Sequence, residues 1–279
     1  MKNMNSIKGL FSAIILSVGM GLAAQDNVLN PQSPEDWMLD GNYVQSLNKT
    51  TPEDGNALIL KGKGIIYSKE MINIEPAKKY RLSGFFKAAS WAKNSGFYLG
   101  VQPYMENCLP LEPRNVNIVK GTETELAAAC EAGDKVIKIK NGTAWKVSPY
   151  AYIAFNADTS GKYTDLPNLE VTPQGGIDKV EKHDDLYEVT LKTPCDKAFP
   201  AGTKVRVHFD VPTFMYAAAN YVTPGTEWKE FKGVISGELG LGIQTNSWWK
   251  GTRKAKIIIL VIGADQELMF KDIKIEEVK

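Results

Sequence analysis

The chain has 279 residues, and 43% of them are hydrophobic, which is enough for a sizeable core and excludes global disorder. Lysine and arginine total 33 against 32 aspartates and glutamates, so no excess of positive charge favours nucleic acid or an anionic membrane as a partner. This length accommodates one large β domain or two small ones.

Residues 1–24 have the features of a secretory signal peptide. Lys2 and Lys8 give a basic start, residues 10–22 are apolar, and small residues follow for cleavage. The apolar run is shorter than the roughly 20 residues that a membrane-spanning helix needs. We therefore expect export to the periplasm, the cell surface or the medium, with no integral membrane segment in the mature chain.

Residues 79–90 show most clearly that the mature chain is built from β-strands. Leu82 and Phe86 lie on one alternating face, which has no charge, and Arg81 and Lys87 lie on the other. A period of two is typical of a strand that buries one face. Helical periodicity is nearly absent from the chain, so the sequence predicts an all-β protein.

The next predicted strand, 96–104, also has two different faces. Its apolar side chains alternate with Tyr98, Gln102 and Tyr104. Aromatic rings and amides on a surface-facing side are the groups with which proteins hold saccharides. We therefore regard these three residues as candidate ligand contacts.

The pattern changes to shorter, turn-rich segments between residues 126 and 209. Strands are predicted at 135–140, 150–155, 177–182, 186–191 and 203–209. We interpret 126–209 as a small β subdomain inserted into a main domain formed by residues 25–125 and 210–279.

The main pattern resumes after the insert. Strands are predicted at 213–222 and 228–235. The unbroken apolar run at 257–262 is typical of a central strand buried on both faces. Alternation in the last strand, 267–278, shifts near Lys271 and Asp272, which predicts a β-bulge there.

Four segments of the two flanking blocks carry a family resemblance. They read YRLSGFF, FYLGVQPY, TEWKEFKGVI and LMFKDIKIEEV. Their order resembles that of the jelly-roll carbohydrate-binding modules of the galactose-binding-like superfamily. Trp228 and Phe231, then Asp272 and Ile273, stand at the places of two recurring motifs. The resemblance implies a jelly-roll β-sandwich and leaves the insert uncovered.

The resemblance also implies a structural calcium ion where the first and last strands meet. Glu35 and Asp272 are the acids at the matching places, although Asp272 stands alone where a doubled acid is common. Calcium would need further oxygen ligands from the backbone.

The segment QTNSWWKGTR, residues 244–253, is the main candidate binding loop. It lies between predicted strands and is rich in turn residues. Sugars present apolar faces edged by hydroxyls, so we expect Trp248 or Trp249 to stack on a saccharide and Asn246 or Arg253 to bind its hydroxyls. The alternative is that the two tryptophans fold back onto the core or the insert.

Trp91 is a second aromatic candidate outside that loop. It lies in the short connection between the strands predicted at 79–90 and 96–104. We include it among the residues expected to contact a saccharide.

The three cysteines allow at most one internal disulfide. Export favours such bonds, and Cys130 and Cys195 bracket the insert, each just before an Ala-Gly turn. We predict a bond between them, with Cys108 left over; three free thiols remain the alternative.

No motif in the sequence indicates catalysis. His183 and His208 are far apart, no zinc spacing or nucleophile elbow occurs, and no pair of carboxylates stands out. We predict a secreted, noncatalytic protein that binds an oligosaccharide or polysaccharide. Two alternatives stay open: a secreted polysaccharide-degrading hydrolase or lyase with a site in the insert, and a structural or adhesion domain that binds protein.

Overall fold

The computed structural model describes residues 27–39, 44–51, 54–55, 57–91, 95–211, 213–238, 245–263 and 266–279. The expected signal peptide, 1–24, lies outside them. Within the described part, no helix has the length and apolar character needed to cross a bilayer. Regular structure is almost entirely β, as predicted.

The strands of the larger body are β1 (Val28–Leu29), β2 (Trp37–Leu39), β3 (Val44–Lys49), β4 (Leu58–Gly62), β5 (Gly64–Ser68), β6 (Ile72–Asn73), β7 (Lys79–Ser90), β8 (Gly96–Tyr104), β15 (Met215–Val222), β16 (Lys229–Ser236), β17 (Lys254–Ile262) and β18 (Glu267–Val278). The strands of the smaller body are β9 (Thr124–Glu125), β10 (Val136–Ile139), β11 (Ala151–Phe155), β12 (Ile177–His183), β13 (Leu186–Leu191) and β14 (Lys204–Phe209). Short 3-10 helices include η1 (Pro34–Asp36) and η3 (Pro113–Asn115).

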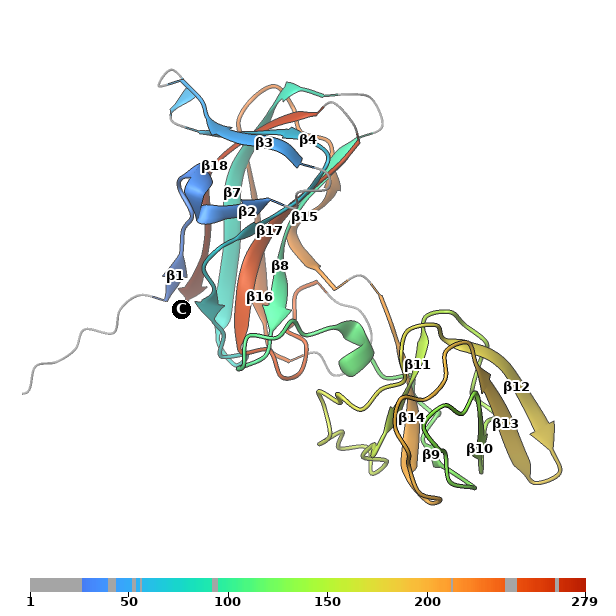
Figure 1. Cartoon of the computed structure of the whole chain (residues 1–279). Coiled ribbons are helices and arrows are strands. Elements are labelled where there is room, and N and C mark those ends of the chain that lie inside the picture. Colours follow the sequence, from blue (N-terminus) through green and yellow to red (C-terminus); the bar gives the residue numbers. More distant parts are fainter. Residues whose placement is uncertain are drawn as a thin grey trace, which may run out of the picture.

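The larger body is a sandwich of two antiparallel sheets (Figure 1). The β7 sheet has the order β16-β7-β18-β4-β3, with β1 beside β18, and the β8 sheet has the order β15-β8-β17-β5-β2, with β6 beside β17. The chain crosses from one sheet to the other at most of its connections, among them β4 to β5, β6 to β7, β7 to β8, β15 to β16, β16 to β17 and β17 to β18. The predicted all-β sandwich is confirmed.

The sandwich core lies between the apolar faces that the alternation predicts. Leu82 and Phe86 of β7 and Phe97 of β8 are fully buried, and the rings of Phe86 and Phe97 stack with centroids 4.6 Å apart. The central strand β17 is buried on both faces, as its composition predicts. The bulge of β18 also lies where it is expected, because the register with β7 shifts between Lys271 and Lys274.

One edge of the sandwich is closed by a close approach of the two sheets. The backbone of β15 passes Gly233 of β16 so closely that a Cβ added at Gly233 would lie 1.9 Å from the carbonyl oxygen of Ala217. Only a residue without a side chain fits there, so this glycine is a requirement of the packing.

The smaller body has its own hydrophobic cluster, formed by residues from Leu126 to Val207. Its two three-stranded sheets are β11-β14-β9 and β10-β13-β12, and the predicted hairpin is formed by β12 and β13. The smaller body begins before the predicted boundary at residue 126, because Val119 packs against this cluster and β9 precedes that residue. The insert leaves the sandwich after β8 and returns at β15, so both connections join the same sheet, and it projects from one end of the sandwich (Figure 1).

Candidate functional site

The outer face of the β8 sheet carries a group of aromatic side chains, which we call the aromatic face. Its members come from β5, β8, β15 and the residue before β15. They are Tyr67, Tyr98, Tyr104, Phe214, Tyr216 and Tyr221. Strand alternation places Tyr98 and Tyr104 of β8 here. In β15, shifts of register with β8 separate Tyr216 from Tyr221, so strict alternation does not apply along that strand. Four of the rings are half-buried, Tyr104 is buried, and Tyr221 is 48% exposed.

The rings of the aromatic face contact one another. Tyr98 lies with its ring centroid 4.4 Å from that of Tyr216 and 5.7 Å from that of Tyr221. Phe214 lies 6.1 Å from Tyr216 and 6.2 Å from Tyr67. These separations are within the range of direct ring contact. The result is a continuous aromatic surface that crosses the sheet from β15 to β5.

Polar groups border the rings at the end of the sheet nearest the insert. The hydroxyl of Tyr104 donates to the amide oxygen of Gln102 at 2.9 Å. Burial raises the pKa of Tyr104 and that of Tyr216 to about 12, so both hydroxyls remain protonated donors at neutral pH. Lys256, which pairs directly with Gln102 across the strands, is 8% exposed.

The outer face of the β7 sheet has a different character. Ion pairs link Arg81 with Glu276 at 2.5 Å and Lys87 with Asp54 at 2.8 Å. Charged groups that neutralise one another are typical of a solvated surface.

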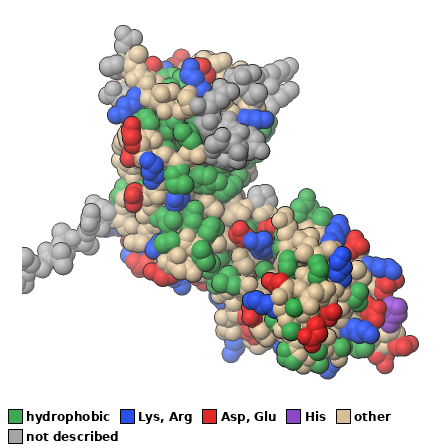
Figure 2. Space-filling view, viewed as in Figure 1, with side chains coloured by type: hydrophobic (Ala, Val, Ile, Leu, Met, Phe, Trp, Pro, Cys, Tyr) green, Lys and Arg blue, Asp and Glu red, His purple; other side chains and the backbone are tan. Residues whose placement is uncertain are grey.

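In the space-filling view, hydrophobic side chains gather across the middle of the sandwich, while charged ones lie along its border and over the insert (Figure 2).

The structure brings together three of the predicted ligand contacts. Tyr98, Gln102 and Tyr104 share the outer face of β8, as their alternation predicts. The aromatic residues of β5 and β15 were not identified from the sequence. Their only signal is alternation in strands that lie far from β8 along the chain.

The prediction that Trp248 or Trp249 is exposed and stacks on a saccharide is wrong. Trp248 is fully buried and Trp249 is 4% exposed, both in the sandwich core. The ring of Trp248 packs edge-on against Tyr80, with centroids 5.7 Å apart. A tryptophan in a polar segment gains more by burying its large ring than by remaining in water. Neither ring is available to stack on a saccharide.

The segment that contains the tryptophans supports the insert. The ammonium of Lys250 donates to the carbonyl oxygen of Tyr163 at 2.8 Å. Gly251 lies so close to Pro167 that an added Cβ would be 2.6 Å from the proline ring. These contacts hold the loop of residues 158–168 against the sandwich.

The other three predicted contacts, Asn246, Arg253 and Trp91, are not among the residues that form the aromatic face. Asn246 is exposed. Arg253 is also exposed, and its guanidinium lies 3.8 Å from the carboxylate of Glu238. Trp91 is half-buried, donates its indole N–H to the carbonyl oxygen of Ser95 and packs against the core.

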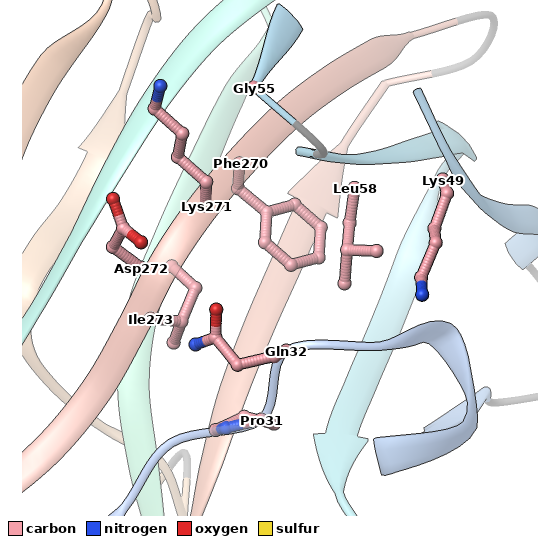
Figure 3. A pocket seen from close by; sticks show the side chains of 9 residues that line it. All are labelled: Pro31, Gln32, Lys49, Gly55, Leu58, Phe270, Lys271, Asp272 and Ile273. Carbon is pink, nitrogen blue, oxygen red and sulfur yellow. The ribbon is translucent and has the colours of Figure 1, made fainter. Parts of the chain in front are cut away.

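Asp272, one of the two expected calcium ligands, lines a pocket of about 470 Å³ beside the bulge of β18 (Figure 3). Asp272 and Gln32 contribute oxygen atoms to the lining, but Lys49 and Lys271 line it as well, and Glu35 does not. Within the described ranges, no three acidic, histidine or cysteine side chains converge to hold a metal. Calcium takes six to eight oxygen ligands, so these side chains do not fit a calcium site.

Cys130 and Cys195 lie side by side in the core of the insert. They are 1% and 3% exposed, and their thiols are in hydrogen-bond contact. Burial raises the pKa of each thiol. Both are free thiols in this structure, so the disulfide remains a prediction. Cys108 is exposed, and its sulfur accepts a hydrogen bond from Lys254 at 3.2 Å.

A buried polar network in the insert was not identified from the sequence. Arg206 donates to Nε2 of His208 and forms an ion pair of 2.8 Å with Asp165. Nδ1 of His208 donates to the carbonyl oxygen of Arg114 at 2.7 Å, since Nε2 is the acceptor. Burial lowers the pKa of His208 to about 4, so it is neutral at neutral pH. The network joins the loop of residues 158–168 to β14 and is structural.

No protein-family model and no curated protein sequence matches this chain.

Proposed function

We propose that this chain is a secreted, noncatalytic carbohydrate-binding protein and that the aromatic face holds the saccharide. The observation that carries the proposal is a continuous group of five aromatic side chains on the outer face of one sheet, bordered by Tyr104 and the amide of Gln102. The opposite sheet carries ion pairs instead.

The chemistry of a sugar ring matches this surface. Its C–H groups form an apolar patch that stacks on an aromatic ring, and its hydroxyls accept and donate hydrogen bonds at the edge. Leaving a group of aromatic side chains partly exposed on one face is unfavourable in water, and such patches mark binding sites. Gln102 and Tyr104 lie where they can bind hydroxyls of a stacked sugar.

The strands of the aromatic face favour binding over hydrolysis. Within β2, β5, β8, β15 and β17 there is no aspartate or glutamate. Glycoside hydrolysis ordinarily uses two carboxylates on either side of the scissile bond. A saccharide bound to this face would therefore be held without a pair of catalytic acids from its strands.

A glycan array probed with the purified mature protein tests the proposal. The wild-type protein should retain at least one class of glycan, and Tyr98→Ala combined with Tyr216→Ala should abolish that retention. Phe85→Ala is the matched control, because Phe85 is a half-exposed ring on the opposite sheet. Retention that survives the double substitution, or that is lost equally in the control, would contradict the proposal.

A further inference from the structure

Lys256 is an unusual residue at the border of the aromatic face, beside Gln102. It is 8% exposed, although lysine is almost never buried unless it is paired. Its ammonium lies 3.5 Å from the thioether sulfur of Met38 and 6.0 Å from the ring centroid of Tyr104. Neither contact supplies a negative charge, and Lys256 forms no ion pair with a carboxylate of the described residues.

The surroundings of Lys256 are also one-sided in charge. The five strands β2, β5, β8, β15 and β17 contain two charged residues, Lys254 and Lys256, and both are cations. The ammonium of Lys254 is engaged by Cys108 and by the carbonyl oxygen of Glu106. A thioether is only a weak acceptor. Lys256 is therefore the cation on this face that lacks a strong acceptor.

We infer that the aromatic face selects a saccharide bearing an anionic group, a carboxylate or a sulfate, which accepts hydrogen bonds from the ammonium of Lys256 while the sugar stacks on the neighbouring rings. This inference rests on the proposed function and names the substrate class of the same site. A buried ammonium is costly without a counter-charge, and a charge-assisted hydrogen bond to an anionic oxygen is stronger than one between neutral groups. The ligand would supply the partner that the protein does not.

Binding to matched pairs of polymers tests this inference. Polygalacturonate and its carboxyl-reduced form differ in the carboxylate, and dextran sulfate and dextran differ in the sulfate. Wild-type protein should bind one anionic polymer about tenfold or more tightly than its neutral counterpart, as expected for a hydrogen bond to a charged group. Which of the two is bound distinguishes carboxylate from sulfate.

Lys256→Met removes the charge while keeping a side chain of similar length against Met38. It should lose the preference for the anionic polymer, with a melting temperature at or above that of the wild type, because the uncompensated buried charge is gone. The matched control is Lys271→Met, because Lys271 lies 4.6 Å from the ring centroid of Trp228 on the opposite sheet. That variant should bind like the wild type.

The outcomes separate this inference from the proposed function. If Lys256→Met binds the anionic polymer as tightly as the wild type does, or if the neutral polymers bind equally well, the inference is overturned. The proposed function would still stand in that case, provided that the Tyr98 and Tyr216 substitutions abolish glycan binding. If the wild-type protein binds none of the four polymers, the inference is also overturned. The glycan array alone then tests the proposed function.

Discussion

Replacing Trp248 by alanine should destabilise the sandwich rather than remove a ligand contact. The side chain is fully buried and packs edge-on against Tyr80. Truncating a buried tryptophan to alanine costs about 3–5 kcal/mol, because a large cavity replaces the ring. For a domain of this size, each kcal/mol lowers the melting temperature by about 2–4 °C. The expected decrease is therefore about 10 °C.

Trp248→Phe distinguishes the contribution of the apolar ring to stability from that of the indole N–H. The indole nitrogen of Trp248 is buried without a hydrogen-bond partner among the described residues. Phenylalanine retains most of the apolar contact and removes this unsatisfied donor, so its cost should be clearly smaller than that of alanine.

Differential scanning calorimetry of both variants measures the effect. Trp228→Ala is the control, since Trp228 is half-buried beneath the ammonium groups of Lys87 and Lys271. A melting temperature for Trp248→Ala within experimental error of the wild type would refute the burial of this ring. Loss of glycan retention at unchanged stability would instead restore the tryptophan as a ligand contact.

Three further predictions concern the insert and the sandwich edge. The pKa of His208 is about 4 in the folded state, below its ordinary 6.5, so the unfolded state binds more protons between these values. The contribution of His208 to the free energy of unfolding should be complete above pH 6.5 and should fall by about 3 kcal/mol as the pH falls to 4. Urea unfolding at several pH values should show this decrease, and His208→Gln should make the free energy of unfolding less dependent on pH. Gly233→Ala should lower the melting temperature strongly, because its Cβ would overlap the carbonyl oxygen of Ala217; an unchanged value would refute that close approach. Nonreducing peptide mapping of exported protein should find Cys130 bonded to Cys195, and three free thiols would contradict this.

The strand pattern was readable from the sequence because each strand buries one face. Alternation in residues 79–90 and 96–104 predicts both the strands and their core faces, and β7 and β8 have these same bounds. The bulge near Asp272 was predictable for the same reason, since a change of alternation leaves a local signal. The resemblance implied a sandwich of two sheets, which alternation alone does not specify.

The binding face was only partly predictable. Tyr98 could be placed on an outer face, but its neighbours Tyr67 and Tyr216 come from β5 and β15, which strand pairing brings together over long sequence distances. The local composition around Trp248 suggested an exposed loop, whereas contacts with the distant Tyr80 bury the ring. Whether one segment buries another depends on the tertiary fold, so the burial of Trp248 could not be predicted from the residues next to it.

Hydroxyl-radical footprinting with and without the retained glycan tests the central claim most directly, because it locates the ligand without any substitution. The proposed site predicts that the glycan protects Tyr98, Tyr216 and Tyr221 from oxidation and leaves Phe85 and Trp228 on the opposite sheet unchanged. Protection confined to Phe85 and Trp228, or to the insert, would contradict the assignment of the aromatic face as the saccharide-binding site.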